Sequence, residues 1–193
     1  MKRHIPNMIT SLNLISGLCS IILALWGYQH QAFCFILMAA VFDSCDGAVA
    51  RALNARSDIG KELYSLADVI SFGAATSIIL FSWYYKQTIG PSMLAFVPLL
   101  MAAAAALRLA KFNLDIRQSS SFLGLPTPSA AILSASAIAY VEICSHAHVN
   151  STLCTIVNSV WFIPALAAVL SVLMLSEIPM FSIKHINKTP PVI

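Results

Sequence analysis

The sequence predicts an all-α integral membrane protein with six transmembrane helices. Hydrophobic residues make up 59% of the 193 residues and charged residues only 10%, whereas soluble domains carry about 25% charged residues. Six apolar stretches alternate with short polar segments, and the length leaves room for six helices of about 20–25 residues. Five of the eight acidic residues fall between Asp43 and Asp68, where two apolar stretches meet. The net charge of +3, without a basic run, predicts no nucleic-acid binding.

The first helix is predicted over residues 11–26. Residues 1–10 form a short polar and basic segment, in which Pro6 is expected to break any helix that began earlier. Thr10 or Ser11 can cap the helix that follows. Because no convincing cleavage site follows the apolar run, this helix is interpreted as retained rather than as a signal peptide.

Five further helices are expected, separated by turns and loops that contain Gly, Pro, Asn or Ser. They are predicted over residues 32–53, 59–85, 93–112, 129–144 and 153–175. A polar, proline-rich tail follows over residues 176–193. We interpret residues 1–193 as one membrane domain. Neither an inverted repeat nor a helix broken within the membrane is evident, which argues against a transporter.

Basic residues indicate the orientation of the helices. Lys86 alone falls on one side of the predicted bundle, and the other ten Lys and Arg residues fall on the opposite side. These ten are Lys2, Arg3, Arg51, Arg56, Lys61, Arg108, Lys111, Arg117, Lys184 and Lys188. Because basic loops remain cytoplasmic, this bias predicts that both termini and the carboxylate-rich turn face the cytoplasm.

Two helical stripes are expected to carry the chemistry. Residues three and four apart share a face of a helix, so Asp43, Asp46 and two small residues, Gly47 and Ala50, form one stripe, with Arg51 beside it.

The second stripe comprises Gly60, Tyr64 and Asp68 on the next helix, which the turn makes antiparallel to the first. Carboxylates at a membrane boundary are costly unless they are paired, hydrated or bound to metal. Oxygen ligands suit Mg²⁺, Mn²⁺ or Ca²⁺, and Mg²⁺ commonly also binds substrate phosphates. The alternative is a buried Asp–Arg network that holds two helices together.

The motif carries a family resemblance. The pattern D-x-x-D-G-x-x-A-R-x8-G-x3-D-x3-D is the signature of the CDP-alcohol phosphatidyltransferase family, and this chain resembles it over nearly its whole length. The segments SLADVISFG, LRLAKFN and FLGLPTPSAA are similar to the phosphatidylserine synthase branch. The motif positions that match are Asp43, Asp46, Gly47, Ala50, Arg51, Gly60 and Asp68.

The resemblance implies a six-helix homodimer that transfers a phosphatidyl group from CDP-diacylglycerol to L-serine and releases CMP. Two Mg²⁺ or Mn²⁺ ions are expected among the motif aspartates. Asp43, Asp46 and Asp68 would be metal ligands, with Asp68 also the catalytic base for the serine hydroxyl. The residues expected to bind the CDP-lipid are Asn7, Thr10, Gly47, Ala50, Arg51, Gly60 and Ser65.

Tyr64 departs from the pattern, because the family has its third aspartate at this position. A neutral phenol is a poor ligand for a hard cation, so one ion is expected to be bound weakly or lost. Three interpretations stay open: a substitution introduced to disable an active enzyme, a natural change in an inactive copy, or a site that tolerates tyrosine. We favour the first, because so much of the remaining pattern is intact.

The acceptor alcohol is predicted from the segments after the fourth helix. Arg108, Lys111, Asn113 and Gly124 are candidates for binding serine, although Arg108 and Lys111 can equally be anchors at the lipid headgroups. Glycerol 3-phosphate or inositol phosphate is the alternative acceptor. A non-catalytic membrane protein that binds CDP-lipid is the alternative function. Membrane lipids are expected partners, and a prokaryotic inner membrane is the expected location.

The five cysteines lie in or beside apolar segments and include no C-x-x-C pair. We interpret each as a small buried hydrophobic residue rather than as a metal ligand. They are Cys19, Cys34, Cys45, Cys144 and Cys154.

Overall fold

A computed structural model describes the chain in five segments, covering residues 4–53, 58–88, 92–114, 124–149 and 151–178. The described residues form helices and no strands, which confirms the all-α prediction. The elements are α1 (His4–Trp26), α2 (Gln29–Ala52), α3 (Asp58–Asp68), the π-helical turn η1 (Val69–Ala74), α4 (Ala75–Gln87), the 3₁₀ segment η2 (Met93–Leu99), α5 (Leu100–Leu114), α6 (Thr127–His146), α7 (Thr152–Val157) and α8 (Phe162–Leu175).

Five helical stretches are long and apolar enough to cross a membrane, judged by length and composition. They are Ile5–Trp26, Gln29–Ala52, Ile59–Gln87, Met93–Leu114 and Thr127–His146. The third stretch joins α3, η1 and α4 into one continuous helical rod. The protein is therefore an integral membrane protein by its helices, and six spans stay a prediction.

The predicted sixth helix is interrupted. It consists of the short α7 and of α8, with non-helical residues from Asn158 to Trp161 between them. Gln87 at the end of α4 donates a hydrogen bond of 2.8 Å to the side chain of Asn158. At 1.5 Å per residue the 14 residues of α8 measure about 21 Å, which is shorter than a hydrocarbon core of about 30 Å. The prediction of one continuous helix over residues 153–175 was therefore wrong, and the break lies beside α7 at one end of the bundle.

The start of α1 also differs from the prediction. The helix already includes His4, so most of the segment 1–10 is helical, and Thr10 is an internal residue rather than a cap. Pro6 is tolerated because it lies in the first turn, where backbone N–H groups have no partner within the helix. The earlier start gives α1 almost two more turns at the end that carries the carboxylates.

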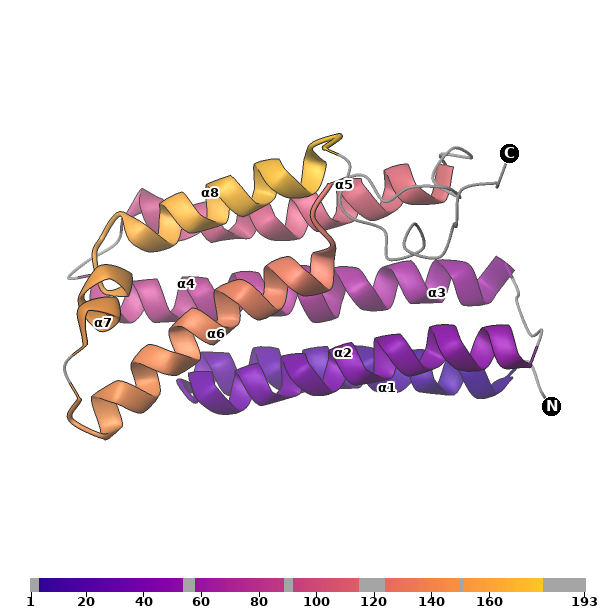
Figure 1. The fold of residues 1–193 in the computed structure, drawn as a ribbon, viewed down its shortest axis with the longest axis horizontal. Helices are drawn as coiled ribbons and strands as arrows, with labels where there is room; N and C mark the ends of the chain where they lie inside the picture. Colours follow the sequence, from indigo (N-terminus) through magenta and orange to yellow (C-terminus); the bar gives the residue numbers. More distant parts are fainter. Residues whose placement is uncertain (1–3, 54–57, 89–91, 115–123, 150, 179–193) are drawn as a thin grey trace, which may run out of the picture.

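The helices pack as an elongated bundle (Figure 1). The rod made by α3, η1 and α4 runs through the middle, with α1 and α2 on one side and with α5 and α8 on the other, while α6 crosses obliquely. The start of α1, the end of α2, the start of α3 and the end of α5 lie at one end of the bundle. We call this the carboxylate end. Lys86 lies near the opposite end, as the distribution of charge predicts.

Small residues allow the middle rod to pack closely on its neighbours. A Cβ atom on Gly17 of α1 would lie 2.6 Å from the Cα atom of Ser71, and one on Gly73 would lie 3.0 Å from the Cβ atom of Ala105 on α5. Such close backbone approach is typical of helix contacts within membranes. These two contacts pack η1, the turn that directly follows Asp68, against α1 and α5.

Candidate active site

The first stripe lies on α2 and faces α1. Asp46 is buried, with 3% of its surface exposed, and Asp43 is half-buried one turn earlier. The Thr10 hydroxyl, also 3.1 Å from the Pro6 carbonyl oxygen, donates a 2.8 Å hydrogen bond to Oδ2 of Asp46. The extended α1 therefore holds one oxygen of Asp46 and leaves Oδ1, which is buried and without a partner.

Asp68 is the last residue of α3 and is buried, with 2% of its surface exposed. The side-chain amide of Asn13, which is fully buried in α1, donates a hydrogen bond of 3.1 Å to Oδ1 of Asp68. Asn13 is fixed in turn by its backbone carbonyl, which accepts a hydrogen bond of 3.0 Å from the Ser71 hydroxyl. Two consecutive turns of α1 thus position carboxylates on two different helices.

Tyr64 joins the two stripes. Its side chain is in hydrogen-bonding contact with the carboxyl groups of both Asp43 and Asp68. It also lies close enough to Asp46 to interact electrostatically. The phenol therefore occupies the space between the carboxylates, as the helical spacing predicts, and its hydroxyl donates where an aspartate would accept.

Two buried carboxylate oxygens in the site are available to a divalent cation. Oδ1 of Asp43 and Oδ1 of Asp46 are buried oxygens without a hydrogen-bond partner, and Mg²⁺ is commonly held by one or two carboxylates together with substrate phosphates. Within the described part of the chain, however, no three His, Cys, Asp or Glu side chains come together in a group that could hold a metal ion. The Tyr64 phenol lies between Asp43 and Asp68.

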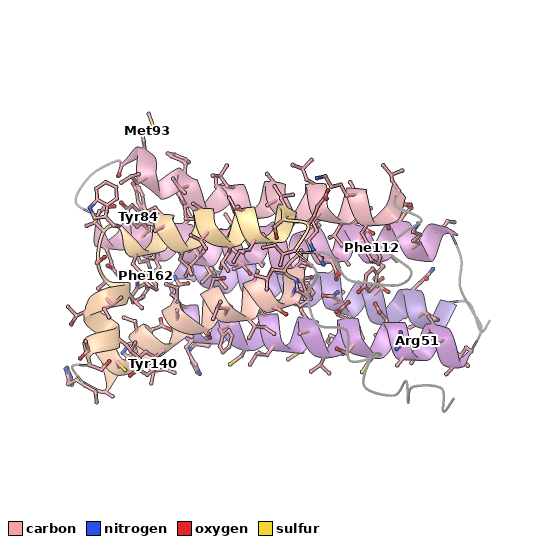
Figure 2. All side chains as sticks on the ribbon, turned by 45° about the horizontal axis from the view of Figure 1, so that its top comes forward. Arg51, Tyr84, Met93, Phe112, Tyr140 and Phe162 are labelled. Atoms are coloured by element: carbon pink, nitrogen blue, oxygen red, sulfur yellow. The ribbon has the colours of Figure 1, made fainter. Side chains whose placement is uncertain are left out.

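The small residues beside the carboxylates leave one face of α2 open. A Cβ atom on Gly47 would meet only the Arg51 guanidinium within 4 Å, at 3.8 Å, so the exposed Arg51 side chain reaches back one turn towards it. Figure 2 shows Arg51 at the carboxylate end. Asn7 and Ala50 are half-buried at the same end. This leaves room for a phosphate group to approach the backbone of α2 beside a guanidinium.

Gly60 and Ser65 lie on α3, and both are half-buried. Ser65 accepts a hydrogen bond of 2.9 Å from the side-chain amide of Asn113, and Lys61 donates one of 3.0 Å to the Asn113 carbonyl. Asn113 therefore ties α5 to α3. Its bonding partners give it a structural role that the sequence did not indicate.

Of the four candidates for serine binding, Arg108 is the one that lies beside the carboxylates. It is half-buried on α5 and interacts electrostatically with Asp68 and Tyr64, and its Nε atom has no hydrogen-bond partner. Lys111 is exposed one turn later. Gly124 has a φ of +72° and packs on the end of α8, where a Cβ atom would lie 2.7 Å from the Ser176 carbonyl oxygen. This packing explains why position 124 is a glycine.

Asn13 and Ser71 are site residues that the sequence reasoning missed. A signal for Asn13 was present, because Asn7, Thr10 and Asn13 recur every three residues along one face of an apolar helix. Polar residues inside a membrane helix face the protein interior and are typically functional. Ser71 had no comparable signal, since a lone serine in an apolar helix commonly bonds to its own backbone.

Comparison with known protein families agrees with this geometry. The family model described as CDP-alcohol phosphatidyltransferase matches residues 3–175, which include both stripes and the α1 residues that hold them. The chain belongs to the CDP-alcohol phosphatidyltransferase family. The family accounts for the two carboxylate stripes at one end of the bundle, and the predicted membership is confirmed.

Several named enzymes are similar in sequence to this chain. A CDP-diacylglycerol–serine O-phosphatidyltransferase of Bacillus subtilis is 38% identical over 133 residues, which are 67% of this chain and 72% of the relative. One of Helicobacter pylori is 40% identical over 131 residues, which are 66% and 54%. One of Methanocaldococcus jannaschii is 33% identical over 174 residues, which are 90% and 72%. The match thus spans about half the length of the Helicobacter relative.

Proposed function

We propose that this chain is a phosphatidylserine synthase, which transfers a phosphatidyl group from CDP-diacylglycerol to L-serine and releases CMP. The observation that carries the proposal is that Asp43, Asp46 and Asp68 interact electrostatically with one another, each at the helix position that the family motif gives it. The names of the similar family members support serine as the acceptor.

The chemistry follows from the position of each side chain. The serine oxygen forms a bond to the phosphorus of the phosphatidyl group, the bond from that phosphorus to CMP breaks, and Asp68 takes the hydroxyl proton. Asn13 holds Asp68 in place for this step. Phosphoryl-type transfer depends mainly on positioning and on neutralising charge. Arg51 would hold a phosphate oxygen, and Arg108 would hold the serine carboxylate.

A divalent cation is part of the proposal. Mg²⁺ or Mn²⁺ bound by Asp43 and Asp46 would neutralise the pyrophosphate and the charge that develops on CMP. Thr10 orients Asp46 for this role, since it holds Oδ2 and leaves Oδ1 for a ligand. The family would place a third carboxylate at position 64, and we infer that its absence weakens or removes the second ion.

We further infer that Tyr64 impairs the enzyme in two ways. It withholds a carboxylate from the cation site, and its hydroxyl competes with serine for the lone pairs of Asp68. The contact of Tyr64 with both stripes also favours a second candidate function. In this alternative the chain binds CDP-lipid and carries out no transfer.

The proposal places the carboxylate end in the cytoplasm, with six membrane-associated helices and both termini on that side. Ten Lys and Arg residues fall on the proposed cytoplasmic side and one falls on the opposite side, which supports this orientation. A cytoplasmic site would allow soluble serine to reach a lipid-bound nucleotide. A homodimer and a prokaryotic inner membrane stay predictions.

One assay separates the candidate functions. Purified protein receives CDP-diacylglycerol, radiolabelled L-serine and Mn²⁺ or Mg²⁺, and labelled lipid and free CMP are measured for the present chain and for Tyr64→Asp. Labelled lipid from Tyr64→Asp supports the proposal. Product with glycerol 3-phosphate but not with serine would reassign the acceptor. No transfer by either chain, together with retained binding of CDP-lipid, would support the non-catalytic alternative.

A further inference from the structure

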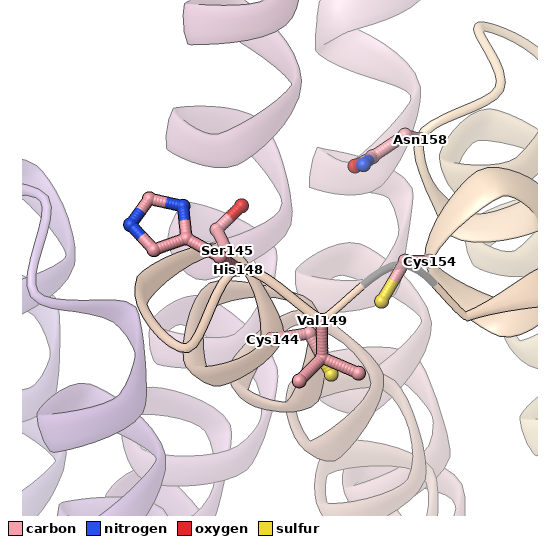
Figure 3. A pocket seen from close by; sticks show the side chains of 6 residues that line it. All are labelled: Cys144, Ser145, His148, Val149, Cys154 and Asn158. Atoms are coloured by element: carbon pink, nitrogen blue, oxygen red, sulfur yellow. The ribbon is translucent and has the colours of Figure 1, made fainter.

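A small pocket lies at the end of the bundle opposite the carboxylates. It has a volume of about 250 Å³ and forms where α6 ends and α7 begins (Figure 3). It therefore belongs to neither stripe. Its lining residues are Cys144, Ser145, His148, Val149, Cys154 and Asn158.

Two of the five cysteines meet in this pocket. Cys144 lies in the last turns of α6 and is buried, and Cys154 lies on α7 and is partly exposed. Their thiols are in hydrogen-bonding contact, with Cys144 as the donor. Among the five cysteines only Cys144 is buried, so the expectation that all five are buried hydrophobic residues was wrong. Cys34 and Cys45 are exposed elsewhere.

The neighbours of Cys154 favour its reactivity. The Ser151 hydroxyl donates a hydrogen bond of 3.3 Å to the sulfur of Cys154 and accepts one of 3.2 Å from its backbone N–H. The hydrogen bond from Ser151 lowers the pKa of the Cys154 thiol. A lower pKa increases the fraction of thiolate, which is the nucleophile in thiol–disulfide exchange.

The turn between α6 and α7 holds the two cysteines close to each other. The Val149 N–H donates a hydrogen bond of 3.0 Å to the Cys144 carbonyl, and this bond closes the turn after α6. His148 in that turn has a φ of +53°, a left-handed conformation that lets the chain reverse within a few residues. The reversal brings α7 back onto the end of α6.

We propose that Cys144 and Cys154 form a disulfide that ties α7 to the end of α6. The pair faces an open pocket from which an oxidant can approach, and a ten-residue separation in sequence closes only a small loop. A soft metal ion is the competing occupant of a Cys-and-His pocket. The described residues contain no group of three such ligands that could hold one, although His148 lines the same pocket.

The reaction balances as two exchange steps with a disulfide oxidant. The Cys154 thiolate attacks one sulfur of that oxidant and expels the other sulfur as a thiolate. The Cys144 thiol loses its proton, attacks the sulfur of Cys154 in this mixed disulfide and expels the second thiolate. Overall the two thiols lose two electrons and two protons, and the oxidant becomes two thiols.

The proposal goes beyond the transferase and rests on its orientation, which places this pocket outside the cytoplasm. Disulfides persist in such oxidising compartments and are rare in a reducing cytoplasm. The same chain would then carry an oxidised pair at this end and a reduced Cys45 on α2 nearer the carboxylate end.

Thiol counting tests the proposal on the full chain in membranes. Denatured protein is treated with a maleimide–polyethylene glycol before and after reduction, and each modified thiol adds a shift on a gel. We expect three modified cysteines before reduction and five after it, and a peptide carrying the Cys144–Cys154 link in mass spectrometry. Cys144→Ser should give four before and four after, because it frees Cys154. Cys34→Ser is the matched control and should give two before and four after.

Five modified cysteines before reduction would overturn the disulfide. An impermeant maleimide, added to intact cells that carry Cys144→Ser, then tests whether Cys154 can be reached from outside. This result distinguishes the two possible reasons. Labelling would mean that the orientation holds and the disulfide alone is wrong. Absence of labelling would mean that the orientation is wrong too. Neither outcome bears on transfer to serine, which the radiolabel assay measures independently.

Discussion

The side-chain amide of Asn13 donates a hydrogen bond of 3.1 Å to the carboxylate of Asp68, across 55 residues of sequence. Both residues are buried, so water does not compete for this bond. The contact links α1, which also holds Asp46 through Thr10, to the candidate catalytic base. The N-terminal helix is therefore part of the proposed site as well as a membrane span.

Tyr64→Asp is expected to increase transfer of the phosphatidyl group to serine by roughly 10²-fold or more, the usual contribution of a general base. It restores a carboxylate to the cation site and removes the phenol from Asp68. The measurement is the initial rate of formation of labelled lipid. Tyr64→Phe is the matched control and should recover less activity than Tyr64→Asp, because it frees Asp68 from the hydroxyl without adding a ligand. Equal rates for the present chain and Tyr64→Asp would contradict the prediction.

Asn13→Ala, made in the Tyr64→Asp chain, is expected to lower kcat and leave KM for CDP-diacylglycerol unchanged. The reason is that Asp68 loses the donor that orients it. Leaving a buried group without its partner should also destabilise the protein by about 1–3 kcal/mol. Steady-state kinetics and thermal unfolding in detergent measure the two effects. A loss of stability without a fall in kcat would assign Asn13 to folding alone.

Thr10→Val in the Tyr64→Asp chain is expected to raise the Mn²⁺ concentration needed for half-maximal activity by about 10–100-fold, as is usual when the partner of a metal ligand is removed. The cause is the loss of the hydrogen bond of 2.8 Å to Asp46. Thr10→Ser keeps the hydroxyl and should behave like its parent. An unchanged Mn²⁺ titration for Thr10→Val would show that Asp46 needs no such support.

Gly17→Ala is expected to destabilise the protein by about 1–3 kcal/mol through overpacking. The added Cβ atom would lie 2.6 Å from the Cα atom of Ser71, and a backbone atom cannot move aside as a flexible side chain can. Gly47→Ala is the control for stability, since its Cβ atom would meet only the Arg51 guanidinium, at 3.8 Å. Thermal unfolding of both variants in the same detergent is the measurement. Equal unfolding temperatures would show that α1 and η1 can separate at no cost.

Arg108→Gln in the Tyr64→Asp chain is expected to raise KM for serine by tenfold or more, because a charge-assisted hydrogen bond contributes about 1.5–3 kcal/mol. Arg108 lies beside Asp68 and its Nε atom is unpartnered, so it can bind a carboxylate there. Lys86→Gln removes a positive charge at the opposite end of the bundle and should leave KM unchanged. If Arg108→Gln left KM for serine unchanged, the serine carboxylate would be bound elsewhere.

The sequence alone determined the membrane class, the approximate helices and the two stripes. These features are local: hydropathy depends on neighbouring residues, and the helical period places Asp43 with Asp46 and Tyr64 with Asp68. The resemblance to the family pattern exposed the missing carboxylate at position 64. No contact with another helix was needed for any of these inferences.

The tertiary structure decided which distant residues meet. Asn13 and Asp68 lie on helices separated by α2, so no periodicity joins them. The break before α8 was hidden for a similar reason, since Val160 and Trp161 continue the apolar pattern while Asn158 is held by Gln87 of α4. Packing between helices thus set the partners of the carboxylates, the break before α8 and the contact between Cys144 and Cys154. Each depends on residues that the chain brings together only when folded.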